Sequence, residues 1–420
     1  MPKLLVLGAG TAGTMVANKL RRRLDRREWQ VAVVDRDDAH HYRPGYLFVP
    51  FGTYRAEDVV RSRHHFLADG VDLVLGEIDR VDADGDEVLL ADGRRLAYDY
   101  LVIATGAVTR PDQTPGLLGR EWRRSIFDFY TLDGAVALGE ALAGFDGGRL
   151  VVHVTEMPIT CPVAPLEMTF LLDAWLRTRG IRDLVDLVYV TPLDGAFTRP
   201  VASAHLGGML EDRGIALEAD FAVERVDPER KALVSYDERE VPFDLLVTVP
   251  LMTGAGFVGR SGLGDELDYV RVDPHTLLSV DHDNLFAIGD ACDIPASKAG
   301  SVAHFAVEVF VDNFVQHVRG LAMTGSFDGH ANCFVESGDD KALLIDFNYD
   351  TEPLPGKYPL PVLGPLSLLK ETRANHLGKL AFRHVYWNVL LPGRRVPLPA
   401  SMSMAGKHAP HEDQHEPQEA

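Results

Sequence analysis

The chain has 420 residues, of which 46% are hydrophobic, and this is enough for two or three domains with large cores. Its net charge of −20 argues against nucleic acid as a partner, because a phosphate backbone would repel it. Three cysteines in so long a chain exclude a structural disulfide framework, and no set of metal ligands is predicted.

The first predicted unit is a strand, a glycine-rich turn, a helix and a second strand. The first strand spans Lys3 to Leu7, the helix reaches about Arg27, and the second strand, Gln30 to Val34, ends at Asp35. This succession is the βαβ unit of a dinucleotide-binding domain. Asp35 stands where a carboxylate accepts hydrogen bonds from a ribose 2′-hydroxyl.

The turn of this unit supplies the predicted phosphate contacts. Gly8 permits the tight turn, Gly10 lets the backbone approach a pyrophosphate, and Gly13 lets the helix pack closely on the sheet. The helix N-terminus stabilises the phosphate charge. The cofactor-binding residues predicted in this unit are Gly8, Gly10, Thr11, Ala12, Gly13 and Asp35.

A third apolar strand starts at Tyr100 and ends in Ala104-Thr105-Gly106. A second α/β unit begins near Gly148. Its predicted elements are a strand from Arg149 to Val154, a helix from Leu166 to Arg177, and a strand from Val185 to Val190.

The turn of the second unit differs from that of an NAD(P)H-binding domain. It reads Thr-Glu-Met-Pro-Ile-Thr-Cys161-Pro-Val-Ala-Pro165 and contains no glycine. Proline lacks an amide donor, so the turn cannot hold a pyrophosphate in the usual way. We infer that this loop serves something other than NADH. The alternative is a nucleotide-binding domain that has lost its function, with Cys161 as a packing residue.

The chain then returns to the first unit. A strand from Asn284 ends in Gly289-Asp290, and a helix-like run from about Ser301 to Val318 follows. With the strand end at Gly106, this segment resembles the two-dinucleotide-binding-domain flavoproteins, in which Asp290 would hold the ribityl chain. The nearby helix would point its positive end at the flavin. A plain NAD dehydrogenase needs neither segment, so the predicted cofactor is FAD. The cofactor-binding residues predicted here are Ala104, Thr105, Gly106, Gly289, Asp290 and Lys298, the last at the flavin edge or the quinone ring.

Cys333 stands in Asn-Cys-Phe-Val-Glu, just before the strand-like run Ala342 to Phe347. Only a thiolate attacks, so a reactive pair of Cys161 and Cys333 needs a lowered pKa, which the helix after Cys161 can supply. Glu167, near the start of that helix, either carries protons or only complements the helix dipole. Cys292 is predicted to be a small packing residue.

The charge balance reverses near the C-terminus. From Lys357 to Arg395 there are seven basic residues and one acidic residue, a net charge of 7 − 1 = +6. Tyr386 and Trp387 suit a headgroup boundary, and this stretch is predicted to dock on anionic lipid. Packing of these helices on the core or on a second subunit is the alternative. The apolar residues at near-helical spacing are Leu366, Leu369, Leu377, Leu380, Trp387 and Leu391.

On these segments the chain resembles the sulfide:quinone oxidoreductases, within the flavin disulfide reductase superfamily. The resemblance covers roughly residues 1–360, and the two cysteine contexts are its specific part. The matching segments are Gly8 to Gly13, Ala104 to Gly106, Thr160 to Glu167, Tyr189 to Leu193, Ile288 to Ala291, Ser297 to His304, Asn332 to Glu336 and Leu344 to Tyr349.

The resemblance implies that sulfide attacks a cysteine disulfide or trisulfide and that two electrons pass through FAD to ubiquinone or menaquinone. By position, Cys161 and Cys333 would be the pair, with Glu167 as the third catalytic residue. Many members of the family carry a further cysteine that tethers FAD or takes part in sulfur release. No cysteine precedes Cys161 here, so FAD is predicted to bind non-covalently.

Three alternatives remain at this stage. A type II NADH:quinone dehydrogenase would need a glycine-rich loop after Val154. A flavocytochrome-type sulfide dehydrogenase flavoprotein usually works outside the cytoplasm, and the N-terminus shows no export signal. A flavoprotein that binds sulfur species or FAD without turnover is the third. No run of about 18 uncharged apolar residues predicts a membrane-spanning helix. The predicted location is therefore peripheral (monotopic) on the cytoplasmic membrane, and a homo-oligomer is compatible with it.

The predicted fold class is α/β, with two Rossmann-like dinucleotide-binding domains and a C-terminal amphipathic membrane-facing region. The predicted division is 1–110 and 271–325 for the FAD-binding domain, 111–270 for the second Rossmann-like domain, 326–400 for the quinone and membrane region, and 401–420 for a disordered tail.

Overall fold

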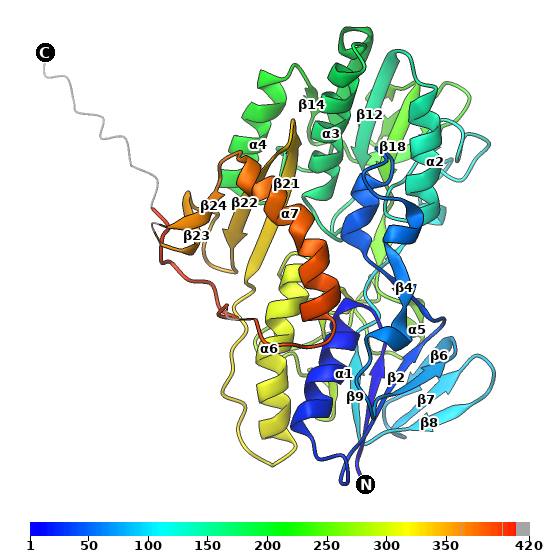
Figure 1. Cartoon of the computed structure of the whole chain (residues 1–420). Coiled ribbons are helices and arrows are strands. Elements are labelled where there is room, and N and C mark those ends of the chain that lie inside the picture. The colour runs from blue at the N-terminus through cyan, green and yellow to red at the C-terminus, as the bar shows by residue number, and fades with distance from the viewer. Residues whose placement is uncertain (362, 397, 409–420) are drawn as a thin grey trace, which may run out of the picture.

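The computed structural model describes residues 1–361, 363–396 and 398–408, and it contains two parallel sheets of five strands each (Figure 1). The first sheet has the order β20-β9-β1-β2-β5, and every neighbouring pair is parallel. Its central strand β1 is apolar and covered on both faces, as parallel sheets require. The strands are β20 (Leu285–Ala287), β9 (Tyr100–Ile103), β1 (Lys3–Leu7), β2 (Gln30–Asp35) and β5 (Asp72–Leu75).

Two helices from opposite parts of the sequence lie side by side on this sheet. They are α1 (Thr11–Arg23), which follows the glycine-rich turn, and α6 (Gly300–His317), which follows β20 (Figure 1). An antiparallel excursion of three strands leaves the sheet between β5 and β9. Its strands are β6 (Ile78–Asp82), β7 (Glu87–Leu90) and β8 (Arg95–Ala97).

The second parallel sheet has the order β11-β18-β12-β13-β14. The strands are β11 (Ile126–Phe127), β18 (Leu245–Val249), β12 (Gly148–Val154), β13 (Val185–Val190) and β14 (Ala216–Glu218). Its helices are α2 (Leu132–Ala143), α3 (Ala164–Thr178) and α4 (Pro200–Asp212). A separate antiparallel sheet consists of β15 (Val223–Asp227), β16 (Ala232–Ser235) and β17 (Glu240–Pro242). These two units confirm the predicted Rossmann-like pair.

A third sheet carries Cys333 and packs against both units. It has the order β21-β22-β24-β23, with β21 (Ala331–Gly338), β22 (Lys341–Phe347), β24 (Gly364–Leu368) and β23 (Gly356–Leu360). Strand β21 lies against α3, and α7 (Arg373–Val385) crosses the sheet and runs toward α1 and α6 (Figure 1). Besides short 3-10 turns, the remaining elements are β3 (Ala39–His41), β4 (Val60–Ser62), β10 (Val108–Thr109), β19 (Met252–Thr253), α5 (Gly256–Arg260) and the π-helical turn η7 (Tyr386–Leu390).

The C-terminal region differs from the prediction in two ways. Leu366 belongs to β24 and not to a helix, and Leu391 is fully buried. Tyr386 and Trp387 are 3% and 2% exposed, so they do not lie at a headgroup boundary. They pack instead on the aromatic rings of the first unit, where burial of their large apolar area is most favourable.

The predicted tail is folded in its first part. Gly356 pairs with Lys407, and the Lys407 ammonium lies 2.5 Å from the Asp346 carboxylate, with both side chains 1% exposed. The prediction of a disordered segment from residue 401 is therefore wrong for 401–408, because a buried ion pair holds it. Residues 409–420 lie outside the described residues.

Candidate functional site

A cavity of about 530 Å³ opens at the carboxyl ends of the first sheet and extends to α3 and α7. Ligands of open α/β sheets bind at this edge. Twelve of the fifteen predicted site residues line it: Gly8, Gly10, Thr11, Ala12, Asp35, Ala104, Thr105, Gly106, Cys161, Glu167, Gly289 and Asp290. The other three, Gly13, Lys298 and Cys333, lie outside its wall.

The glycines of the turn have different roles. Gly8 has φ +95°, and a Cβ there would lie 2.6 Å from the carbonyl oxygen of Ala104. A Cβ at Gly13 would overlap the carbonyl oxygen of Gly8, so Gly13 serves helix packing. Gly10 has no other described atom within 4 Å of its Cβ position and faces the cavity. The backbone at Gly10 is therefore open to a ligand.

The far end of the cavity contains charged residues around the end of β2. The Asp35 carboxylate accepts a hydrogen bond from the Ala9 amide at 2.7 Å and forms an ion pair with Arg63 at 3.0 Å. Arg63 also donates to the Ala9 carbonyl at 2.6 Å. These contacts fix the Asp35 carboxylate while it still faces the cavity.

The C-terminal turn η7 reaches the glycine-rich turn through one hydroxyl. The Tyr386 hydroxyl lies 2.7 Å from Thr11 Oγ1 and 2.7 Å from His40 Nε2. Burial lowers the pKa of His40 to about 3, so its imidazole is neutral. No local sequence signal predicted this contact, because 375 residues separate Thr11 from Tyr386.

The residues around the cavity fit an FAD. Thr105 Oγ1 is buried and finds no hydrogen-bond partner among the described residues, although it faces the cavity. Helix α6 begins at the cavity with Ala299 and Gly300, so its positive end faces the same space. Thr160 donates a hydrogen bond to the Asp290 carboxylate at 2.9 Å. These groups suit a pyrophosphate, a ribityl chain and a ring that accepts negative charge.

Lys298 differs from the prediction. Its ammonium donates to the Cys292 carbonyl at 2.8 Å and lies 3.7 Å from the centre of the Tyr269 ring. The side chain therefore turns away from the cavity, because buried carbonyls and an aromatic face compensate its charge there. Its backbone carbonyl instead accepts a hydrogen bond from the Cys161 amide at 2.5 Å.

Cys161 is held in an unusual conformation at the cavity wall. Its φ is +52°, a left-handed value that costs a residue other than glycine about 1–3 kcal/mol. The Cys161 carbonyl accepts from the Tyr130 hydroxyl at 3.2 Å and from the Ala164 amide at 2.9 Å. Together with the hydrogen bond to Lys298, these bonds fix the backbone on both sides of the Cys161 side chain.

Cys333 lies on β21, the strand that packs against α3. Its sulfur is 3.8 Å from Ser301 Oγ, at the start of α6. Charges on Glu167 and Lys379 act on both Cys161 and Cys333, and Cys333 itself acts on Cys161. The fold thus brings together two thiols that are far apart in the sequence. Both are free thiols in this structure.

The electrostatics of the thiols differ from the prediction. We expected the positive end of α3 to lower the pKa of Cys161. Burial and then the Glu167 carboxylate raise the pKa of Cys161 instead, and burial raises that of Cys333 to about 11. The Lys379 ammonium opposes both shifts.

Glu167 is 1% exposed, and burial raises its pKa. One of its oxygens accepts from the Glu336 amide at 2.7 Å and from the Lys379 ammonium. The sequence placed Lys379 only among the basic residues of the C-terminal stretch. Its partner lies 212 residues earlier, so no local pattern could have identified this ion pair.

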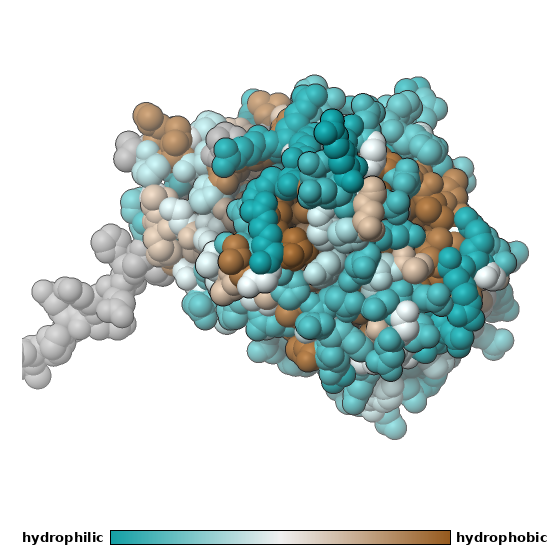
Figure 2. Space-filling view, turned by 90° about the horizontal axis from the view of Figure 1, so that it is seen from below, coloured by the Kyte–Doolittle hydropathy of each residue, from teal (hydrophilic) through white to brown (hydrophobic). Residues whose placement is uncertain are grey.

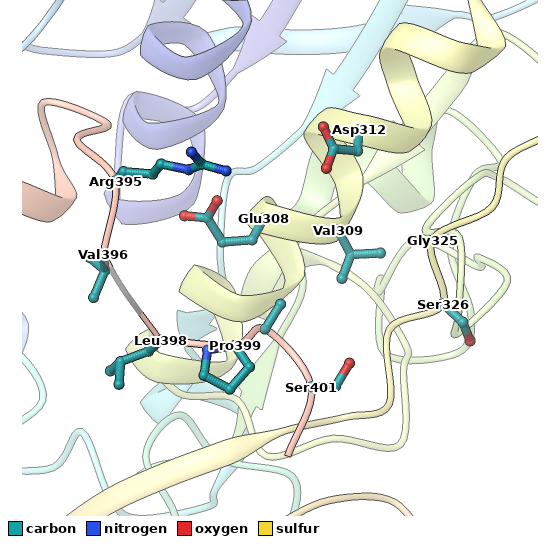
Figure 3. A pocket seen from close by; sticks show the side chains of 11 residues that line it. Glu308, Val309, Asp312, Gly325, Ser326, Arg395, Val396, Leu398, Pro399 and Ser401 are labelled. Atoms are coloured by element: carbon teal, nitrogen blue, oxygen red, sulfur yellow. The ribbon is translucent and has the colours of Figure 1, made fainter. Parts of the chain in front are cut away.

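A second cavity, of about 640 Å³, lies between α6 and residues 395–396 and 398–401 (Figure 3). Glu308, Asp312 and Arg395 are among the residues around it. Neither a cysteine nor the glycine-rich turn lines it. Of the two candidate redox cysteines, Cys161 lines the first cavity, and neither lines the second.

Comparisons with known proteins agree with this geometry. A family model described as pyridine nucleotide-disulphide oxidoreductase matches residues 2–152. The mitochondrial sulfide:quinone oxidoreductase of Dictyostelium discoideum is 26% identical over 398 residues, covering 93% of this chain and 86% of that protein. The Schizosaccharomyces pombe enzyme of the same name is 27% identical over 419 residues, covering 92% and 89%.

The chain is a homologue of the sulfide:quinone oxidoreductases. The solved structure of that enzyme from Aquifex aeolicus matches with a TM-score of 0.78 at 19% identity, over 94% of this chain and 92% of that one. An NADH dehydrogenase-like protein of Mycobacterium tuberculosis is 29% identical but covers only 54% of this chain. The predicted resemblance is confirmed, and the NADH alternative is not favoured.

Proposed function

We propose that this chain is an FAD-dependent sulfide:quinone oxidoreductase, which oxidises sulfide to sulfane sulfur or polysulfide and passes two electrons to membrane quinone. One observation carries the proposal. Cys161 lines the cavity at the place where an NADH-binding domain has its glycine-rich loop, and the charges of Glu167 and Lys379 act on both Cys161 and Cys333. Three relatives that match 92–93% of the chain are named sulfide:quinone oxidoreductases.

The chemistry needs the two thiols as an oxidised pair. Hydrosulfide attacks one sulfur, the bond between the two cysteines breaks, and a persulfide and a thiolate result. Oxidation of each hydrosulfide ion to sulfane sulfur releases two electrons and one proton. A bound FAD, held by the residues of the first cavity, would supply the acceptor for this electron pair and its route to quinone. Lys379 stabilises negative charge at the thiols, and Glu167 receives protons.

The turn between β12 and α3 supports sulfide over NADH as electron donor. Its backbone at Cys161 is occupied by contacts to Lys298, Tyr130 and Ala164. The amides of Cys161 and Ala164 donate to protein carbonyls, whereas a pyrophosphate would need such amides free. A flavocytochrome-type sulfide dehydrogenase flavoprotein would differ from a sulfide:quinone oxidoreductase only in its electron acceptor. Reoxidation of the reduced flavin by a quinone analogue therefore separates these two candidates.

We further propose that FAD is bound non-covalently, because the chain has no cysteine before Cys161. Acid or heat should release all flavin from the polypeptide. Flavin that remains attached after denaturation would contradict this.

Docking on the cytoplasmic membrane surface is also proposed for the C-terminal region. Leu363 on the β23–β24 connection and Leu377 on α7 are 80% and 63% exposed. Further along α7, Lys379 and Phe382 line the cavity, so one helix joins the exposed surface to the flavin site. No helix within the described ranges is long and apolar enough to cross a bilayer. The face seen in Figure 2 carries its hydrophobic side chains in separate patches.

Anaerobic stopped-flow tests the central proposal. Sulfide should bleach the flavin absorbance of the oxidised protein rapidly, NADH should not, and a short-tail ubiquinone or menaquinone analogue should restore the colour. Cys161→Ser and Cys333→Ser should each abolish bleaching by sulfide while FAD stays bound. Cys292→Ser is the matched control, because Cys292 is buried and its thiol only donates to the Gly289 carbonyl at 3.0 Å.

Bleaching by NADH instead of sulfide would replace this proposal with an NADH dehydrogenase. Wild-type rates in both cysteine variants would remove the cysteine mechanism.

A further inference from the structure

A line of buried ionisable groups extends from the thiols toward the surface. The inference drawn from it takes sulfide as the substrate and therefore rests on the proposed function. Glu167 and Lys379 form its inner end at the cavity wall. Glu336 comes next, because its amide donates to the Glu167 carboxylate at 2.7 Å. The Glu336 side chain is 1% exposed. The Lys379 ammonium is bonded to Glu167, and its charge also acts on the Glu336 carboxylate.

The outer end of the line is a histidine. His376 Nδ1 lies 2.9 Å and 3.1 Å from the two carboxylate oxygens of Glu336. Its Nε2 lies 3.9 Å from the carboxylate of Asp340, which is 78% exposed in the turn between β21 and β22. His376 and Lys379 are three residues apart on α7 and therefore share a helix face.

The charges facing Glu336 come from three elements. They are Lys379 and His376 on α7, Glu167 on α3, and Asp340 in the β21–β22 turn. Burial raises the pKa of Glu336 and of Glu167, which brings both carboxyl groups closer to proton exchange near neutral pH. For Lys379, burial acts to lower the pKa, but the carboxylates of Glu167 and Glu336 prevail and raise it.

We propose that Glu336 and His376 form the route by which protons released from sulfide leave the buried thiol site. Glu167 accepts a proton from hydrosulfide. A water between Lys379 and Glu336 then carries a proton from the Lys379 ammonium to the Glu336 carboxylate, and Lys379 regains a proton from Glu167. His376 takes the proton from Glu336 on Nδ1 and releases another from Nε2 to water beside Asp340. Each hydrosulfide ion gives up one proton and one electron pair, so the export of its proton along this route keeps charge from accumulating in the core.

The conservative variants are His376→Asn and Glu336→Gln. An Asn amide keeps a donor toward Glu336, and Gln keeps the shape and the backbone amide of Glu336. His384→Asn is the matched control, because His384 is exposed on the same helix and its hydrogen bonds within the described ranges are to Asn388. All are studied as FAD-loaded protein with thermal unfolding as a check on folding.

The measurement is the stopped-flow rate of flavin bleaching by sulfide across the pH range. Both variants should be slower than wild type by at least about tenfold, a modest share of what general acid–base groups contribute. Free imidazole should restore the His376→Asn rate in a concentration-dependent manner, and photochemical reduction of the flavin should be unchanged. The control should match wild type.

Wild-type rates and pH profiles in both variants would overturn the route while leaving the proposed function intact. Slow bleaching that imidazole does not restore would also overturn it, because a structural contact between α7 and β21 would then suffice. If sulfide failed to bleach the wild-type flavin, the proposed function would fail and the route with it.

Discussion

The substitution Lys379→Met tests the ion pair beside the thiols. The side chains of Lys379 and Glu167 are 11% and 2% exposed, so the variant leaves Glu167 as a buried carboxylate without its cation. Removing one partner of a buried pair costs about 3–5 kcal/mol. The Glu336 amide still donates to Glu167 at 2.7 Å. We therefore expect a loss at the lower end, about 3 kcal/mol in the free energy of unfolding.

The loss should depend on pH. Burial raises the pKa of Glu167 and Lys379 opposes that rise, so the pKa of Glu167 should rise further in Lys379→Met. The folded variant then keeps a proton that the unfolded chain releases above its ordinary pKa of about 4.3. The free energy of unfolding therefore falls as pH rises between the unfolded and folded pKa values. The deficit relative to wild type should be smaller at about pH 6 than at about pH 8.

Urea unfolding of the FAD-loaded protein, followed by circular dichroism at both pH values, measures these differences. The double variant Glu167→Gln/Lys379→Met removes both charges and should be more stable than Lys379→Met alone. Lys370→Met is the matched control on an exposed lysine and should stay within about 0.5 kcal/mol of wild type. A loss below about 1 kcal/mol at both pH values, or a double variant no more stable than the single one, would refute the reasoning.

Three further substitutions test other parts of the fold. Gly13→Ala places a Cβ against the backbone of the glycine-rich turn and should lower the free energy of unfolding by denaturant by about 3 kcal/mol and reduce the FAD content. The control Gly208→Ala, with open space around its Cβ position, should do neither. Equal stability of the two variants would contradict the packing role of Gly13. Tyr386→Phe removes a buried hydroxyl with two hydrogen-bond partners and should lower the free energy of unfolding by about 1–3 kcal/mol. FAD should dissociate faster from this variant, as measured by flavin fluorescence. An unchanged dissociation rate would show that the contact from η7 does not stabilise cofactor binding. Lys407→Met removes the ammonium beside the buried Asp346, which keeps His330 and Asn332 as partners, so it should lower the free energy of unfolding by about 3 kcal/mol, the lower end of the range for a broken buried pair. A wild-type urea midpoint would mean that the last described segment does not stabilise the sheet that contains β22.

Much of the fold was predictable because local patterns determine it. The strands at Lys3–Leu7 and Val185–Val190 begin and end where the apolar runs predicted. The helix starting at Gly300 was predicted within one residue. Parallel strands covered on both faces are uniformly apolar, and a tight turn over a phosphate needs glycine, so these features are visible along the chain itself.

The C-terminal stretch was predicted less well, because periodicity shows that a face is apolar but not what covers it. Tyr386 and Trp387 have the pattern of a membrane-facing helix and are buried against the first unit instead. Leu377 on the same stretch remains exposed. A lipid surface and a protein core select the same residues, so only the tertiary contacts distinguish them.

The sequence by itself determined the cofactor class, the missing NADH loop and the two cysteines with their distinctive neighbours. Only the tertiary structure decided that Lys298 turns away from the cavity, that Glu167 pairs with Lys379, and that Glu336 and His376 continue this line outward. The physical reason is that charges are paired by distance in space. A carboxylate on α3 and an ammonium on α7 have no shared pattern until the chain folds them into one dry site.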